Sequence, residues 1–237
     1  MKKVLITGST QGIGKSIATA LVAKGYEVVV HCSKDLEKAE KVRKEISASK
    51  AVVCDLSDMA DIKSLYAKTG TVDCLILNAS VQYKNKWTDV SESEFDNQID
   101  VNFKSTFFLM QDYLPAMKEK GFGRVITIGS VNQYRNHPEL TIYSATKCAV
   151  EGLVRNIAKQ VAPYGITVNN VAPGAILTPR NRSVYDDDNA REKVESLIPI
   201  GRFGEPEDIV GAIVLLCSEQ GSYITGADIV IDGGMKL

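Results

Sequence analysis

Apolar residues along this chain gather in short runs separated by longer amphipathic segments. Several runs are apolar at consecutive positions, which is typical of strands buried on both faces of a parallel sheet. The pattern therefore predicts strands of that kind. The predicted strands are KVLIT (3–7), EVVVH (27–31), AVVCD (51–55), DCLILN (73–78), RVITIGS (124–130), TVNNVAP (167–173) and DIVIDG (228–233).

The segments between these runs have the polar and apolar spacing of helices. The predicted helix 36–46 is rich in charge pairs four residues apart. The predicted helix 91–117 opens with the capping-box residues Ser91 and Glu94. Regular alternation of strand and helix predicts an α/β fold: a Rossmann-type, doubly wound parallel sheet of about seven strands with helices on both faces. The predicted helices are 15–25, 36–46, 91–117, 143–162 and 205–219.

The alternation continues without a linker or repeat, which predicts one domain over residues 1–237. Its cofactor-binding half covers about 1–130, and its catalytic and substrate half covers about 131–237. One long polar stretch, about 178–204, interrupts the pattern. Its composition fits a substrate lid and a plain surface excursion equally well.

Composition narrows the classes of function. The formal net charge is -1, so the chain lacks the basic field that nucleic-acid binding requires. No stretch approaches the ~20 apolar residues of a membrane helix, and the first apolar run ends at Thr7-Gly8. The five cysteines lie far apart without metal-ligand spacing, which favours reduced thiols, a cytoplasmic location and no metal site.

Two short motifs carry candidate chemistry. TGSTQGIG, residues 7–14, lies between the first strand and the first helix, where glycines allow a pyrophosphate to approach the helix N-terminus. YSATK, residues 143–147, places a phenol and an ammonium one helical turn apart. A nearby ammonium lowers the pKa of a phenol, which suits it to proton transfer. Taken alone, the Tyr–Lys pair is also a common decoration of helix surfaces.

The two motifs together resemble the short-chain dehydrogenase/reductase family, and the resemblance extends over essentially the whole chain. Ser80 departs from the usual N-A-G pattern, which ends in glycine. Other motifs of the family follow in the expected order: CDL (54–56), LNAS (77–80), DVNF (100–103), IGS (128–130), VAPGAILT (171–178) and IDGG (231–234).

The resemblance implies a role for each catalytic residue. Tyr143 is the general acid in carbonyl reduction and the base in alcohol oxidation. Lys147 lowers the pKa of Tyr143 and binds the nicotinamide ribose, while Ser130 orients the substrate oxygen. Asn102 holds a water that connects Lys147 to a proton relay. Read singly, Asn102 and Ser130 are ordinary helix-surface and strand-end residues.

The resemblance also implies a cofactor site along the carboxyl ends of the strands. Asp55 caps the adenine ring, although DLSD also looks like the start of a helix. The predicted cofactor-binding residues are Gly8, Thr10, Gln11, Gly12, Ile13, Gly14, His31, Ser33, Lys34, Asp55, Leu56, Asn78, Ala79, Ser80, Tyr143, Lys147, Pro173, Gly174, Ile176 and Thr178.

The end of the second predicted strand favours NADP(H) over NAD(H). An acidic residue there binds both ribose hydroxyls of NAD, and Cys32 occupies that position. Ser33 and Lys34 instead offer a hydroxyl and a positive charge to a 2′-phosphate, and His31 adds a possible donor. Against this, many NADP-dependent relatives carry Arg at the position of Gln11.

The implied function is an oxidoreductase that moves a hydride between nicotinamide and a ketone or secondary alcohol. The chain most resembles 3-oxoacyl-[acyl-carrier-protein] reductases, so a 3-oxoacyl thioester is the first expected substrate. Sugar, polyol and steroid alcohols are alternatives, and a non-catalytic nucleotide-binding regulator is the alternative from another class. The resemblance further implies a homotetramer.

Acyl carrier proteins are acidic, so a reductase that acts on them is expected to have a basic rim around its cleft. The residues expected to form this rim are Lys118, Lys120, Arg124 and Arg135.

Overall fold

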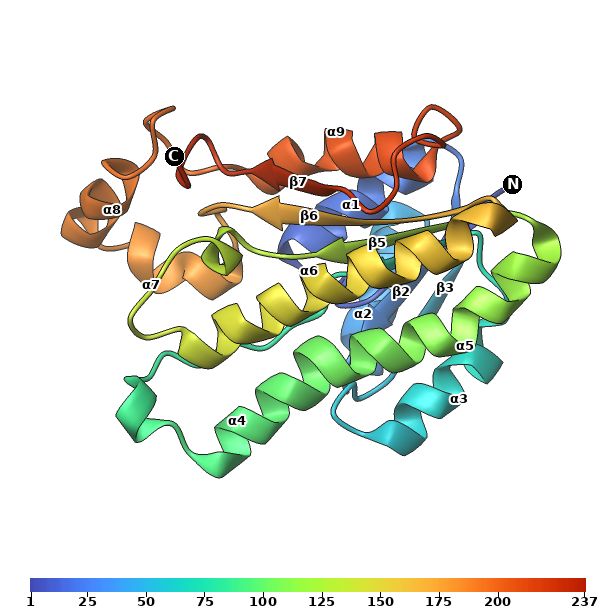
Figure 1. The fold of residues 1–237 in the computed structure, drawn as a ribbon, viewed down its shortest axis with the longest axis horizontal. Coiled ribbons are helices and arrows are strands. Elements are labelled where there is room, and N and C mark those ends of the chain that lie inside the picture. Colours follow the sequence, from blue (N-terminus) through green and yellow to red (C-terminus); the bar gives the residue numbers. More distant parts are fainter.

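Seven parallel strands form one sheet in the order β3-β2-β1-β4-β5-β6-β7. The structure is a computed structural model that describes residues 1–237 (Figure 1). All seven predicted strands are confirmed, with ends that move by one or two residues. The strands are β1 (Lys3–Ile6), β2 (Glu27–Cys32), β3 (Lys50–Val53), β4 (Cys74–Leu77), β5 (Gly123–Ile128), β6 (Ile166–Pro173) and β7 (Asp228–Ile231).

The predicted helices are also present. They are α1 (Gly12–Ala23), α2 (Leu36–Ile46), α4 (Glu92–Ile99) with α5 (Ser105–Lys120), α6 (Thr141–Val161) and α9 (Pro206–Cys217). The capping box of α4 forms as expected, because the Ser91 hydroxyl accepts from the Glu94 N–H and the Glu94 carboxylate accepts from the Ser91 N–H.

Helix α3 (Met59–Thr69) lies between β3 and β4, where no helix was predicted. The Asp58 carboxylate accepts from the Ala60 N–H and so caps its first turn. Its buried side chains are few, chiefly Ile62 and Leu65. A stripe this narrow gives a weak periodic signal in the sequence, and the packing against the sheet stabilises the helix.

Helices cover both faces of the sheet (Figure 1). On one face α3, α5 and α6 pack through side chains such as Leu65, Leu109 and Val154. On the other face α1, α2 and α9 pack through side chains such as Ile17, Val42 and Ile213. Strand residues alternate between the two clusters, which is why each strand is apolar at consecutive positions.

Two features depart from regular structure near the carboxyl ends of the strands. The helix predicted over 91–117 contains a π-helical turn at Asp100–Lys104, between α4 and α5. Such turns occur often at functional sites, and this one contains Asn102. The polar stretch 178–204 is not irregular throughout, because it contains two short helices, α7 (Arg182–Tyr185) and α8 (Asp188–Glu195).

The chain enters the sheet at β1 and builds outward in both directions, so the order reverses between β1 and β4. In doubly wound sheets the ligand-binding crevice lies at this reversal, beyond the carboxyl ends of the strands. No helix of the chain is both long and apolar enough to cross a membrane.

Candidate active site

A cavity of about 950 Å³ runs along the carboxyl ends of the strands. The glycine loop after β1 and the segment after β6 both line it, and Thr178 of that segment lies next to Gly12. Every residue predicted to bind the cofactor lines this cavity, and so do the predicted catalytic residues Ser130, Tyr143 and Lys147. The sequence motifs therefore converge on a single site.

The glycine loop is pressed against the end of β4. A Cβ atom on Gly14 would lie 2.4 Å from the Gly8 carbonyl oxygen and 2.5 Å from the Asn78 side-chain nitrogen. Gly8 itself has φ +64°, in the left-handed region that favours glycine. The Asn78 amide donates to the carbonyls of Thr7 and Gly8 at 2.9 and 3.0 Å, which fixes the loop.

These residues fit the pyrophosphate of a dinucleotide. The N-terminal residue of α1, Gln11, makes no side-chain capping bond, and the first turn contains no acidic residue. The backbone N–H groups of this turn are consequently available to an anion, and the helix dipole favours negative charge there. Gln11 instead accepts a hydrogen bond from Lys38 at 2.8 Å.

His31 supports the glycine loop from inside the protein. Its Nδ1 accepts from the Gly8 N–H at 3.0 Å, and its Nε2 lies 3.0 Å from the Cys54 carbonyl oxygen, to which it donates. Both ring nitrogens are therefore occupied. The sequence prediction that His31 donates to a 2′-phosphate is wrong, because the ring holds the loop in place.

The end of β2 presents two lysines to the cavity. Lys34 pairs with Asp55 at 3.0 Å, and Lys38 reaches Gln11 from the first turn of α2. Asp35, the nearest carboxylate after Cys32, is used as the cap of α2 and accepts from the Lys38 N–H. Sequence reasoning missed Lys38. The sequence could have indicated Lys38 by its position, because it lies in the first turn of the helix that follows β2.

Asp55 does not begin a helix, because Asp58 is the cap of α3. The Asp55 carboxylate accepts from the Ser57 N–H and hydroxyl at 3.0 and 2.7 Å. Burial by itself raises the pKa of Asp55, but the Ser57 bonds and Lys34 outweigh it and lower the pKa below its usual value. Asp55 is thus an ionised acceptor at the adenine end of the cavity.

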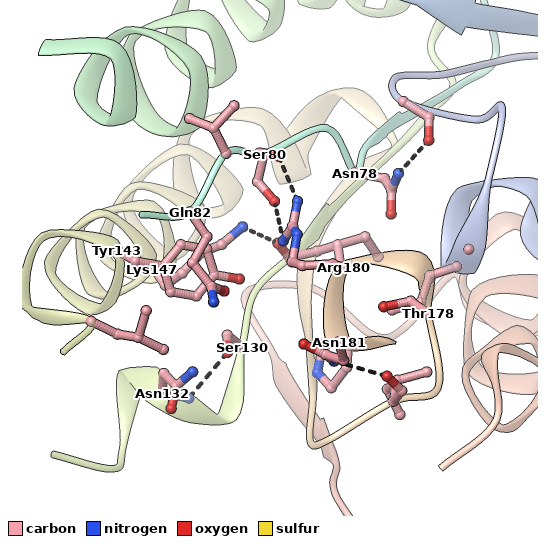
Figure 2. Close-up of a pocket in the computed structure, with 18 of the residues that line it drawn as sticks. Asn78, Ser80, Gln82, Ser130, Asn132, Tyr143, Lys147, Thr178, Arg180 and Asn181 are labelled. Atoms are coloured by element: carbon pink, nitrogen blue, oxygen red, sulfur yellow. Dashed lines mark hydrogen bonds between the residues drawn. The ribbon is translucent and has the colours of Figure 1, made fainter. Parts of the chain in front are cut away.

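Tyr143 and Lys147 lie at the other end of the cavity, on the first turns of α6 (Figure 2). Both are buried, and Lys147 is only 3 % exposed. The Lys147 ammonium lies 5.4 Å from the centre of the Tyr143 ring and donates to the Ile128 carbonyl at 2.7 Å. The pair is therefore part of the interior, which excludes the alternative of a solvent-exposed decoration.

Charge outweighs burial at Tyr143. Burial alone raises the pKa of the phenol, but the Lys147 ammonium, the Arg180 guanidinium and the hydroxyls of Ser130 and Ser80 lower it to a net value below the usual range. The pKa of Lys147 is also lowered, first by burial and then by Arg180, although Tyr143 opposes this. The lowered pKa of Tyr143 favours proton transfer through its phenol.

Ser130 is fixed at the end of β5 by its own turn. Its hydroxyl accepts from the Asn132 N–H at 3.1 Å, and its N–H donates to the Gln133 side chain at 3.3 Å. Gln133 in turn donates to Asp228 at 2.6 Å. This network, which begins on β7, orients the Ser130 hydroxyl toward Tyr143.

Asn102 is the one predicted catalytic residue that does not line the cavity. Its side chain accepts from the Val81 N–H at 2.8 Å and donates to the Val81 carbonyl and the Thr146 hydroxyl at 2.9 and 3.2 Å. Both amide hydrogens are thereby used to join the segment after β4 to α6. The water-holding role implied by the resemblance stays a prediction.

Arg180 is the main site residue that sequence reasoning missed. From the segment after β6 it reaches across the cavity, and its guanidinium donates to the Ser80 hydroxyl at 3.0 Å and to the Ser80 carbonyl at 2.5 Å (Figure 2). Its position two residues after Thr178 was the only signal in the sequence. Contact with Ser80, 100 residues earlier, depends on the fold.

The end of the cavity that holds Tyr143, called the substrate end below, carries more positive than negative groups. Lys84, Arg135 and Lys193 line it together with Arg180, whereas Glu139 is its only acidic residue. His137 also lines it. Burial lowers the His137 pKa, and Lys84 and Arg135 add to this effect against the opposing Glu139. Trp87 is 74 % exposed and does not line the cavity.

The expected basic rim is only partly present. Arg135 lines the cavity, but Lys118, Lys120 and Arg124 do not. Lys120 forms an ion pair with Asp73, which precedes β4, and Arg124 is a buried residue at the start of β5. These residues lie at the amino ends of the strands, opposite the site, because parallel strands place their starts at one edge of the sheet.

Comparison with known proteins agrees with this geometry. A family model described as enoyl-(acyl carrier protein) reductase matches residues 8–236. The chain is 36 % identical to the 3-oxoacyl-[acyl-carrier-protein] reductase FabG of Staphylococcus aureus, with 100 % of this chain and 98 % of that protein covered.

Two solved structures are similar along nearly the whole chain. A 3-oxoacyl (acyl-carrier-protein) reductase from Agrobacterium tumefaciens with NADP bound is 35 % identical, with a TM-score of 0.93 over 98 % of this chain and 93 % of that one. A gluconate 5-dehydrogenase from Burkholderia cenocepacia, in complex with NADP and tartrate, is 30 % identical, with a TM-score of 0.91 over 99 % and 94 %. The chain belongs to the short-chain dehydrogenase/reductase family. It is an oxidoreductase that acts on CH–OH and C=O groups, from the branch that resembles 3-oxoacyl-[acyl-carrier-protein] reductases.

His31 predicts an acid-sensitive stability. Burial lowers its pKa from 6.5 to about 4, because a charged ring would lose its hydration there. Between these pH values the unfolded chain binds more protons than the folded one, so the free energy of unfolding falls as the pH drops through this window. The loss reaches about 3 kcal/mol, at ~1.4 kcal/mol per pKa unit.

Denaturant unfolding of wild type and His31→Asn at several pH values measures this effect. Asparagine keeps an acceptor near Gly8 but does not titrate, and the carboxylate contributions cancel in the difference. We expect the wild type to lose more stability than the variant between pH 6.5 and 4. Equal pH dependence in the two proteins would contradict this account of His31.

Proposed function

We propose that this protein is an NADP(H)-dependent oxidoreductase in which Tyr143 exchanges a proton with the oxygen of a ketone or secondary alcohol. The observation that carries the proposal is the buried Tyr143–Lys147 pair beside Ser130, in the same cavity as the glycine loop. A regulator that only binds nucleotide has no need of this pair. Its presence favours turnover over the non-catalytic alternative.

Each catalytic residue has its own role in this reaction. The Tyr143 and Ser130 hydroxyls stabilise negative charge on the substrate oxygen, and Tyr143 delivers or removes the proton. Lys147 keeps the phenol acidic and binds the nicotinamide ribose. The bound nicotinamide supplies or accepts the hydride. We assign to Asn102 the relay role implied by the family, along with its observed joining of Val81 to Thr146.

The preference for NADP(H) is supported by the end of β2. Cys32 carries no charge, Asp35 is used as a helix cap, and Ser33, Lys34 and Lys38 surround the place where a 2′-phosphate would lie. Two of the similar proteins hold NADP in their structures.

Two substrate classes have support. The similarity to 3-oxoacyl-[acyl-carrier-protein] reductases favours 3-oxoacyl thioesters. The excess of cationic side chains at the substrate end, together with the similarity to a gluconate 5-dehydrogenase, favours an anionic hydroxy or oxo acid. Both classes undergo the same chemistry at Tyr143.

We also propose a homotetramer. Phe107 is 37 % exposed on α5, whose other face covers the sheet, and Phe95 is 43 % exposed on the preceding helix α4. Exposed aromatic residues of this kind are typical of interfaces between subunits.

Sedimentation velocity at micromolar concentration tests the assembly. We expect a species of four 25.8 kDa chains, and we expect Phe107→Glu to shift it toward smaller species because a carboxylate would be buried in the contact. A monomer alone in the wild type would exclude the tetramer.

Tyr143→Phe tests the proton transfer. The change removes the phenolic hydroxyl and spares Lys147, so turnover of any accepted ketone should fall by ~10²–10⁴-fold while NADPH affinity stays within about threefold. Steady-state rates and NADPH fluorescence titration measure the two quantities. The control is Tyr164→Phe, at a tyrosine that is 47 % exposed and remote from the cavity. A Tyr143→Phe rate within threefold of wild type would exclude Tyr143 as the acid.

Cys32→Asp tests the cofactor preference. The wild type should have a higher kcat/KM with NADPH than with NADH. The new carboxylate should repel the 2′-phosphate and bind the ribose of NAD, which lowers the NADPH/NADH ratio at least tenfold, or ~1.4 kcal/mol. Cys32→Ser changes the side chain without adding charge and should leave the ratio near that of the wild type. A wild-type preference for NADH would show that this strand end does not select NADP.

A further inference from the structure

Arg180 and Ser80 form a contact that proton and hydride transfer do not require. The guanidinium donates to the hydroxyl and the carbonyl of Ser80, and it forms no ion pair with any carboxylate of the chain. These bonds occupy only part of its N–H donors. A planar, fixed guanidinium with free donors is the group that proteins use to bind carboxylates in a two-pronged geometry.

The guanidinium contacts Ser80, whose hydroxyl acts on Tyr143. Figure 2 shows its side chain reaching toward Ser80, alongside the Tyr143 and Lys147 pair. Its charge acts on both Tyr143 and Lys147. A substrate whose carbonyl oxygen contacts Tyr143 and Ser130 must therefore place the groups next to that carbonyl within reach of Arg180.

The surroundings favour an anion at this position. Lys84, Arg135 and Lys193 add positive charge to the same end of the cavity, against the single carboxylate of Glu139. A cavity of one predominant sign concentrates ligands of the opposite sign. Ser80 contributes as well, because the family's usual glycine at this position has no hydroxyl to hold Arg180.

We propose that Arg180, held by Ser80, binds a carboxylate of the substrate and selects oxo acids and hydroxy acids over neutral ketones, alcohols and thioesters. This inference rests on the proposed carbonyl chemistry and specifies its substrate class. The carboxylate lies near the carbon that exchanges the hydride, because Arg180 contacts Ser80, whose hydroxyl acts on Tyr143. In the alternative reading, Arg180 merely fastens the segment after β6 to Ser80.

Matched substrate pairs separate these readings. We would measure kcat/KM with NADPH for acetoacetate against methyl acetoacetate, and for 5-keto-D-gluconate against D-fructose. In at least one pair the wild type should prefer the acid by tenfold or more. That preference should fall at least tenfold in Arg180→Gln. It should fall less in Arg180→Lys, which keeps the positive charge, and in Ser80→Gly, which keeps the backbone carbonyl that accepts from Arg180.

The control is Arg182→Gln. Arg182 lies on the next turn, is 75 % exposed by its side chain and pairs with Asp186, and it does not line the cavity. It should keep the wild-type preference. A wild type that favours the neutral member of both pairs, or an Arg180→Gln variant with an unchanged ratio, would overturn the inference.

A second measurement does not depend on turnover. Malonate, a dicarboxylate with no ketone, should raise the thermal unfolding temperature of the NADP⁺-loaded wild type and of Arg182→Gln, but not of Arg180→Gln. Equal stabilisation of all three proteins would also overturn the inference.

The two proposals fail in different ways. Arg180-dependent malonate binding without reduction of any ketone in the panel would contradict the oxidoreductase assignment alone. Reduction of the neutral member at a rate equal to or above that of the acid in both pairs would contradict the role of Arg180 alone.

Discussion

Helices on both faces of a parallel sheet leave only the ends of the strands open for chemistry. The two apolar clusters cover the central strands on both faces, so a polar group in the middle of the sheet would lose its hydration. Parallel direction then brings all carboxyl ends to one edge. The glycine loop, Asp55, Asn78, Ser130 and Gly174 meet there although they come from across the chain.

The same edge supplies the electrostatics of the site. Lys147 is buried but donates to a strand-end carbonyl, which lets an ammonium remain beside Tyr143 in a region of low dielectric. Its charge acts strongly on the phenol because little water screens it. Burial and charge act against each other at Tyr143, and the acidity of the phenol depends on charge exceeding burial.

Several polar residues near the site serve to hold others in place. His31 fixes Gly8, Asn102 fixes the segment at Val81, and Asp228 fixes Ser130 through Gln133. Each has its hydrogen-bonding capacity directed at backbone or at another side chain. Sequence motifs identify such residues as parts of the site, but their bonds distinguish a supporting role from direct contact with ligands.

The sequence by itself determined the seven strands, the helices other than α3, α7 and α8, and the members of the glycine, Ser130 and Tyr143–Lys147 motifs. It did so because burial on two faces and special backbone turns leave local patterns of residue type. Only the tertiary structure decided the roles of His31, Lys38 and Arg180 and removed Lys120 from the rim. These depend on which side chains meet across loops and opposite sheet edges, and local periodicity contains no record of such contacts.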